Sequence, residues 1–302
     1  MTIEREKMIS RNLLSKKISS FVISVICLVF AWGCSKSQDQ KKQAPQTQIN
    51  VQKGIDLDLQ GNLDAAMTEL NKAIAANSQN ASAFAARGNI YVKKNDYDRA
   101  LDDFSNAISI NPDFAESYAA RGLIYGNYKH NYDLALQDLN KAVSLNPQNI
   151  KYIRFRAALA VGKNDWALAV SDYNKIIEMD PQDKQVYSAR GLAHLMLQNY
   201  KQALADISRA ILENQDVVAN YNNRCYCQDK LGEYNKALTD CNNSIALNPG
   251  VAASYDTRAG VYVHKKEYDR AWADVKKIID LGGQPSSDML EELKKESGRS
   301  NG

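Results

Sequence analysis

The sequence is poor in the residues that interrupt helices and in those that staple small domains. Its 302 residues include only 6 Pro, 15 Gly and 5 Cys, while 44% are hydrophobic and 24% are charged. This composition excludes a disordered tail and a disulfide-stapled miniprotein. Sustained charge of one sign is also missing: the net charge is +3, and residues 1–33 carry the whole excess. The neutral remainder predicts no nucleic-acid partner.

The apolar run of residues 21–33 is too short to cross a bilayer. Thirteen helical residues measure about 20 Å, whereas a hydrocarbon core is about 30 Å thick. Five basic residues precede the run: Arg5, Lys7, Arg11, Lys16 and Lys17. This order predicts a signal peptide over residues 1–33. Translation from Met1 and from Met8 both satisfy the pattern.

Small residues precede a cysteine at the end of this run. Ala31 and Gly33 stand before Cys34, and the arrangement resembles the lipobox of bacterial lipoproteins. The resemblance implies that Cys34 is lipidated and anchors the protein at the periplasmic face of a bacterial cell envelope. Ser35 stands where Asp would retain an enteric lipoprotein in the inner membrane, so the outer membrane is favoured. A soluble secreted form and an uncleaved anchor are the alternatives.

Residues 34–46 are rich in Gln, Lys and Ser and lack apolar periodicity. They are expected to form a flexible tether.

A period of 34 residues organises the rest of the chain. Ala-Arg-Gly recurs from Ala86, Ala120 and Ala189, and Asn-Pro recurs at Asn111 and Asn146. Each period contains two amphipathic stretches joined by a short polar turn, which predicts a helical hairpin. Alignment on these motifs gives seven consecutive segments: 47–80, 81–114, 115–149, 150–183, 184–217, 218–251 and 252–285.

Two columns of residues mark the same places in successive segments. A small residue is needed where two helices approach closely, and Ala fills one column in every segment: Ala66, Ala100, Ala135, Ala169, Ala203, Ala237 and Ala271. An aromatic column after the turn is expected to fill the gap between hairpins: Tyr97, Tyr132, Trp166, Tyr200, Tyr234 and Tyr268.

These segments resemble the tetratricopeptide repeat (TPR), which has Gly and Tyr in its first helix, Ala and Phe in its second, and Pro at its close. The resemblance covers residues 47–285 and implies an all-α fold, an α-solenoid or superhelix of seven helix-turn-helix repeats. Residues 286–297 predict a C-terminal capping helix with Asp288 as its N-cap, followed by a tail at 298–302.

Two charged columns predict structural ion pairs along the stack. The Asp column lies 16 or 17 residues after the Arg column, which carries the chain over the turn and back beside the first helix. Each pair is expected to contribute about 1 kcal/mol or less. The predicted pairs are Arg87 with Asp103, Arg121 with Asp138, Arg156 with Asp172, Arg190 with Asp206, Arg224 with Asp240, and Arg258 with Asp274.

Three cysteines lie beyond Cys34. Cys225 takes the Gly place and Cys241 the Phe place of the sixth segment, whose usual occupants touch across the hairpin. A disulfide between them and a pair of buried thiols are the two alternatives. Cys227 is left over, and a Cys-x-Cys pair without a nearby His is weak evidence for metal.

Motifs for catalysis are missing. The three His residues fall in separate segments, and the sequence has neither a Gly-rich phosphate loop nor a GxSxG elbow. The sequence therefore predicts a protein that is no enzyme and has no metal site and no cofactor.

The resemblance implies a concave groove, lined by first helices, that binds proteins or peptides. The predicted groove residues are Asp58, Asn89, Glu116, Lys151, Arg154, Gln185, Leu192, Leu195, Asn222, Tyr226, Asp229 and Asp256. Some family members clamp a C-terminal carboxylate with Lys, Asn and Arg. The corresponding places here, which include Ala85, Ala120 and Phe155, match only in part. Carboxylate capture is therefore disfavoured.

The favoured function is a membrane-anchored scaffold or adaptor that mediates protein–protein interactions in the cell envelope. The alternative is a cell-wall carbohydrate-binding protein or an accessory protein of an envelope enzyme.

Overall fold

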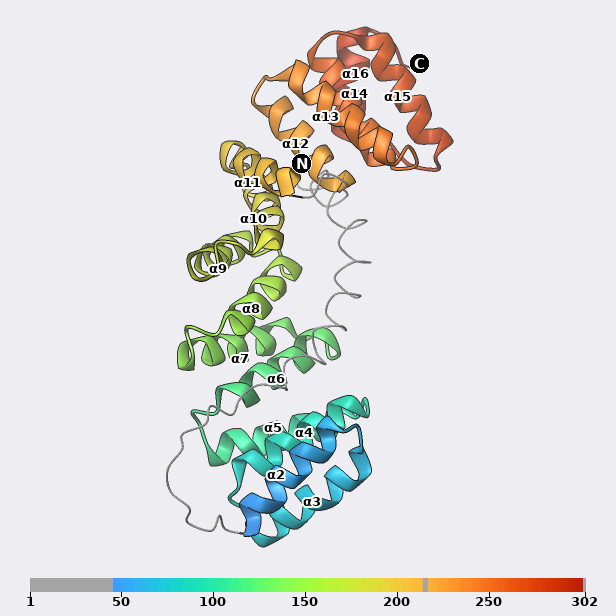
Figure 1. Cartoon of the computed structure of the whole chain (residues 1–302). Helices are drawn as coiled ribbons and strands as arrows, with labels where there is room; N and C mark the ends of the chain where they lie inside the picture. The colour runs from blue at the N-terminus through green and yellow to red at the C-terminus, as the bar shows by residue number, and fades with distance from the viewer. Residues whose placement is uncertain (1–45, 214–216, 301–302) are drawn as a thin grey trace. The chain divides into compact units, whose positions relative to one another are not determined.

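The computed structural model describes residues 46–213 and 217–300, and within these ranges the chain forms fifteen α-helices and no strand (Figure 1). The helices are α2 (Gln46–Leu59), α3 (Leu63–Ala76), α4 (Ala81–Lys93), α5 (Tyr97–Ile110), α6 (Ala115–Asn127), α7 (Tyr132–Leu145), α8 (Ile150–Gly162), α9 (Trp166–Met179), α10 (Lys184–Met196), α11 (Tyr200–Glu213), α12 (Val218–Lys230), α13 (Tyr234–Leu247), α14 (Ala252–His264), α15 (Tyr268–Asp280) and α16 (Ser287–Ser297).

Local sequence explains where the helices start and where the chain reverses. The side chains of Asn80, Asp96 and Asn131 each accept a hydrogen bond from a backbone N–H of the first turn, which satisfies donors that a helix start leaves free. Inside each predicted hairpin, one turn residue adopts the left-handed conformation that Gly and Asn tolerate best. These residues are Gly61, Asn95, His130, Asn164, Gln198, Gly232 and Lys266.

The chain divides into two compact units. The first unit contains residues 46–165, from α2 to α8, and the second begins at Trp166 and contains α9 to α16. In the first unit, α2/α3, α4/α5 and α6/α7 pair as antiparallel hairpins, and each hairpin packs on the next (Figure 1). In the second unit, α10/α11, α12/α13 and α14/α15 do the same. The predicted all-α fold of paired helices with a capping helix is confirmed.

The hydrophobic core of the hairpins is built around the repeated Ala residues. All seven members of the Ala column are 0% exposed, because the two helices of a hairpin approach each other there. The aromatic column reaches the next hairpin, as expected: Tyr97 stacks on Tyr128 with ring centroids 3.8 Å apart. Close packing of this kind makes the stack sensitive to changes in side-chain volume.

The capping helix differs in detail from its prediction. The N-cap of α16 is Ser286, and Asp288 lies in the first turn. The backbone N–H of Ser286 donates to Asp256 Oδ1 at 2.8 Å, so a partner on α14 sets the start of the helix. Met289 and Leu293 are buried against Trp272. α16 therefore covers the apolar end of the last hairpin.

The predicted signal peptide, Cys34 and tether lie outside the described residues, apart from Gln46, which begins α2. Within residues 46–213 and 217–300, no helix combines the length and the apolar character needed to span a membrane.

Candidate functional site

A cavity of about 510 Å³ lies in the first unit, between the first helices of three successive hairpins. α2, α4 and α6 form its walls, and Leu70 of α3 and Phe104 of α5 reach it from behind. Three predicted groove residues line it: Asp58, Asn89 and Glu116. Its volume lies in the usual range for ligand pockets.

Two glycines on the first helices allow the side chains of the cavity floor to approach the helix backbone closely. A Cβ at Gly54 would lie 2.7 Å from Leu70 Cγ, and a Cβ at Gly88 would lie 3.0 Å from Phe104 Cε1. Only Gly lets these side chains approach the first-helix backbone so closely. The floor is therefore apolar, although the walls carry amides and hydroxyls.

Two buried polar atoms in the cavity wall lack a partner. Ser117 is 0% exposed. In the part of the chain that the structure describes, neither its Oγ nor Asn89 Oδ1 has a hydrogen-bond partner. Leaving such a group unpaired costs about 1–3 kcal/mol. Both residues line the cavity.

Sequence reasoning identified Asn89 but missed Ser117. In neighbouring repeats, the place of Ser117 is taken by Ala83, Tyr152 and Val186, all of which are buried. The same place holds the buried polar residues Asn220 and Ser254 in the last two repeats, so the sequence alone does not single out Ser117.

The cavity lining carries negative but no positive charge. Both carboxylate oxygens of Asp58 accept hydrogen bonds from Lys93 at 2.7 Å, and Lys93 lies outside the lining. Glu116 is exposed and forms no ion pair with any described residue. Burial raises the pKa of Tyr152 on α8, and the charge of Glu116 raises it further. Glu116 therefore adds a negative charge at the rim of the cavity.

The remaining predicted groove residues do not meet at this cavity. Lys151 is exposed and Arg154 is partly buried, both on α8. In the second unit Gln185 is exposed, whereas Leu192 and Tyr226 are partly buried.

The structure corrects the groove prediction at three positions in the second unit. Leu195 is 4% exposed and packs in an apolar core with Ala203 and Ile207. Asn222 is 2% exposed and Asp229 is 7% exposed. The reason is that α12 packs against both α10 and α14, so neighbouring helices cover these three side chains.

His264 links three helices of the second unit. Its Nδ1 lies 2.7 Å from Asp229 Oδ1 on α12, and its Nε2 lies 3.6 Å from Glu292 Oε1 on α16. The hydrogen bond to Asp229 raises the pKa of His264 against the opposing effect of burial. In contrast, burial lowers the pKa of His194. His264 thus helps to hold the capping helix.

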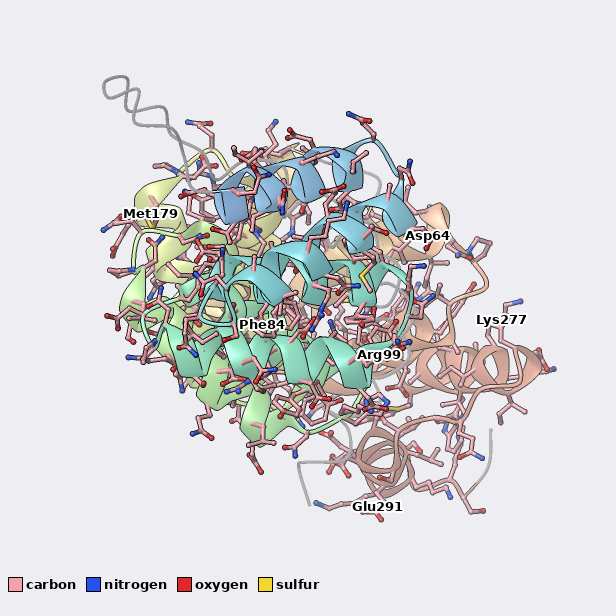
Figure 2. All side chains as sticks on the ribbon, turned by 90° about the horizontal axis from the view of Figure 1, so that it is seen from below. Asp64, Phe84, Arg99, Met179, Lys277 and Glu291 are labelled. Carbon is pink, nitrogen blue, oxygen red and sulfur yellow. A yellow bond between two sulfur atoms is a disulfide. The ribbon has the colours of Figure 1, made fainter. Side chains whose placement is uncertain are left out.

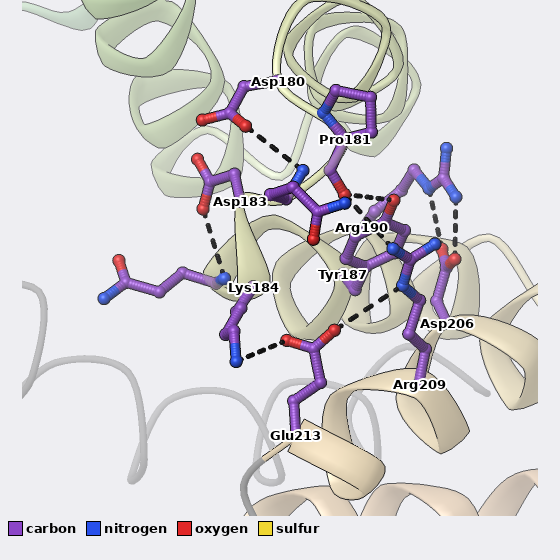
Figure 3. A network of polar contacts seen from close by, with 11 residues as sticks. Asp180, Pro181, Asp183, Lys184, Tyr187, Arg190, Asp206, Arg209 and Glu213 are labelled. Atoms are coloured by element: carbon purple, nitrogen blue, oxygen red, sulfur yellow. Dashed lines mark hydrogen bonds and ion pairs between the residues drawn. The ribbon is translucent and has the colours of Figure 1, made fainter.

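Five of the predicted Arg–Asp pairs form within single units. In each, Nε and a terminal nitrogen donate to the two carboxylate oxygens at 2.6 to 2.8 Å, as Figure 3 shows for Arg190 and Asp206. The hydrogen bonds to Asp raise the pKa of each Arg. Arg156 lies on α8 in the first unit, and Asp172 lies on α9 in the second.

The same Arg residues also reach the preceding hairpin, through a column that sequence reasoning missed. Arg87 donates to Asn71 Oδ1 at 2.8 Å, and Arg121 donates to Ser105 Oγ at 3.0 Å. Arg156, Arg190 and Arg258 use Asn140, Asn174 and Asn242 in the same way. The sequence contained this pattern, since each partner precedes its Arg by 16 residues.

A second ladder joins hairpins at their turn ends. Lys94 pairs with Asp64, Lys129 with Asp98, and Lys163 with Asp133, each across 30 or 31 residues. Figure 2 shows Asp64 and Arg99 at this end of the hairpins and Phe84 toward the other. Arg299 pairs with Asp269, also across 30 residues. A residue after α16 therefore makes the contact that a Lys of the next repeat makes elsewhere.

The two cysteines of the sixth repeat are joined in the structure. Cys225 of α12 and Cys241 of α13 form a disulfide across the hairpin, and both are 0% exposed. Cys227 is a free buried thiol, and burial raises its pKa to about 12.

Within residues 46–213 and 217–300, no group of three His, Cys, Asp or Glu side chains is arranged to hold a metal ion.

Family models match much of the repeat region. A model described as "TPR repeat" matches residues 59–94 and 88–127, and models described as "Tetratricopeptide repeat" match residues 115–149 and 156–217. Together they cover about half of the chain. No curated protein matches the sequence.

Solved structures share the fold at low sequence identity. A tetratricopeptide repeat protein from Parabacteroides merdae is 21% identical with a TM-score of 0.51, over 83% of this chain and 99% of that one. YrrB, described as a TPR protein with an unusual peptide-binding site, is 21% identical with a TM-score of 0.53, over 64% and 97%. Pseudomonas aeruginosa pilF is 16% identical with a TM-score of 0.54, over 71% and 97%. These similarities show the fold alone.

Proposed function

This chain belongs to the tetratricopeptide repeat family, and from that premise we propose that its first unit binds a segment of a partner protein in the cavity between α2, α4 and α6. The observation that carries the proposal is the pair of unpartnered buried atoms, Ser117 Oγ and Asn89 Oδ1, in the wall of that cavity. A bound chain supplies hydrogen-bonding groups along its whole length and satisfies such atoms.

The composition of the cavity supports a peptide ligand. Its floor of Leu70 and Phe104 suits an apolar side chain, and the amides of Gln48, Gln52 and Asn80 suit peptide backbone. The fold relative YrrB is described as having a peptide-binding site, which also supports this function.

Site-specific photocrosslinking in cells tests the proposal. A crosslinker at Ser82, on the cavity wall, is expected to give discrete adducts with a protein partner. The same group at the exposed Asn106 of α5, away from the cavity lining, is the control and is expected to give none. Asn89→Arg, which fills the cavity, is expected to abolish the Ser82 adducts. Equal labelling at both positions, or adducts that survive Asn89→Arg, would contradict the proposal.

We propose further that the protein acts as a membrane-anchored adaptor. The support is the sequence: a short apolar run with basic residues before it, small residues next to Cys34, and Ser35 after it. Lipidation at Cys34 would place the repeats on the periplasmic face of the envelope, with the outer membrane favoured.

Replacing the anchoring cysteine tests this location. Cys34→Ala is expected to move most of the protein from the membrane fraction to the soluble fraction, or to leave it as an unprocessed precursor. Cys27→Ala, inside the apolar run, is the matched control and is expected to change neither. Membrane association and processing of Cys34→Ala equal to those of the unaltered chain would exclude the lipid anchor.

A further inference from the structure

The lining of the cavity in the first unit combines unpartnered polar atoms with negative charge. Asn89 Oδ1 accepts hydrogen bonds, and Ser117 Oγ accepts or donates one. Glu116 adds a carboxylate at the rim with no ion-pair partner in the described ranges. No Lys, Arg or His lines the cavity. A ligand group rich in donors and positively charged complements this set.

The distribution of apolar and polar groups in the cavity restricts which kind of side chain fits as a ligand. The cavity floor and part of one wall are apolar, formed by Val51, Ile55, Leu70 and Phe104, whereas the two unpartnered polar atoms lie on α4 and α6. An arginine side chain has the same division, since its methylene stem packs on apolar surface and its guanidinium carries five donors and no acceptor. A carboxylate ligand does not suit this cavity, because Ala85 stands at a place of the carboxylate clamp and supplies no positive charge.

We propose that this cavity binds an arginine side chain of the partner segment, with the guanidinium directed to Asn89, Ser117 and Glu116. The inference rests on the proposed function, because it names the residue that the peptide site selects. Neutral hydrogen bonds alone discriminate weakly, whereas hydrogen bonds between a guanidinium and a carboxylate are roughly twice as strong. Glu116 is therefore the residue that distinguishes arginine from a neutral side chain of the same length.

The raised pKa of Tyr152, to which Glu116 contributes, agrees with this electrostatic picture. Asp58 contributes little to it, because Lys93 already pairs with both of its oxygens.

Binding of peptide pools to the purified full-length chain tests the inference. The pools are dodecapeptides with blocked ends and degenerate flanks, and their central residue is fixed as Arg, citrulline or Glu. Citrulline keeps the length of Arg but exchanges the charged guanidinium for a neutral ureido group. The Arg pool is expected to bind at least about tenfold more tightly than the citrulline pool, a difference of about 1.4 kcal/mol, and the Glu pool is expected to bind least.

Two variants make the test specific to this cavity. Glu116→Gln is expected to reduce the preference for Arg over citrulline to less than about threefold, whereas Ser117→Ala is expected to weaken the binding of both pools. Ser117→Ala is also expected to keep or raise the melting temperature, since it removes a buried hydroxyl without a partner. The controls are Asp102→Asn and Ser109→Ala, at exposed positions of α5 outside the lining, and both are expected to keep the full preference.

The outcomes separate the inference from the proposed function. Equal binding of the three pools, or a preference for Arg that persists in Glu116→Gln, overturns the arginine site. If Ser82 then still crosslinks to a partner, the peptide site stands without arginine selectivity. If no pool binds and Ser82 gives no adduct, both the inference and the proposed function fail.

Discussion

Phe104→Ala is expected to lower the free energy of unfolding of the first unit by about 3–5 kcal/mol. The ring is 1% exposed and packs in one apolar cluster with Ala100, Ala120 and Ile124. It also lies against Gly88, where an added Cβ would be 3.0 Å from the ring. Because the surrounding helices are fixed by their own contacts, they cannot collapse onto the space that the ring leaves, so a cavity term adds to the lost transfer energy.

Urea denaturation followed by far-UV circular dichroism measures this loss. The control is Ile279→Ala on α15, where the side chain is 59% exposed, and a change within about 0.5 kcal/mol is expected. A stack of repeats distributes its stability over neighbouring units, so hydrogen exchange should show the Phe104→Ala loss first in α4, α5 and α6. A loss of less than about 1 kcal/mol would mean that Phe104 is not part of a close-packed core.

Reduction of the Cys225–Cys241 bond is expected to lower the free energy of unfolding of the second unit by about 3 kcal/mol. The bond closes a loop with a sequence separation of 16 residues, and in the chain-entropy treatment closing a loop of about this length restricts the unfolded chain by that amount. The unfolded state therefore carries most of the effect. Cys227 is not expected to exchange with the pair, because burial raises its pKa to about 12 and the thiolate is the reactive form.

Thermal unfolding with and without reductant measures the contribution of the disulfide. The double variant Cys225→Ala, Cys241→Ala serves as the control, since its melting temperature should no longer respond to reductant. Mass spectrometry after alkylation in denaturant should show a single modified thiol among the cysteines at 225, 227 and 241 of the native protein. Three modified thiols in that region, or no response of the native protein to reductant, would leave the pair as buried thiols.

Much of this architecture was predictable because every repeat carries the same pattern of residues. The Ala column at full burial and the pairing of Arg with Asp both follow from positions that recur every 34 residues. The contacts from Arg87 to Asn71 and from Lys94 to Asp64 obey the same period and were equally accessible to inspection. The contact from Arg87 to Asn71 was missed because the sequence reasoning paired each Arg with one partner only.

The candidate site was only partly predictable. Asp58, Asn89 and Glu116, which were predicted as groove residues, line one cavity, but Leu195 and Asp229, at the repeat position of Asp58, are buried, and so is Asn222. A repeat position specifies which side of a helix a residue occupies. It does not specify how large the neighbouring side chains are.

The sequence by itself determined the helices, their pairing into hairpins within each unit and the five Arg–Asp pairs inside those hairpins, since all of these depend on contacts within about one repeat length. Only the tertiary structure decided where the face of first helices stays open. In the first unit, a cavity stays open between α2, α4 and α6, and Leu70 and Phe104 reach it from behind. In the second unit, α12 contacts both α10 and α14, and Leu195, Asn222 and Asp229 are buried. That difference arises from side-chain volumes on three neighbouring helices at once, and no single column of the sequence contains it.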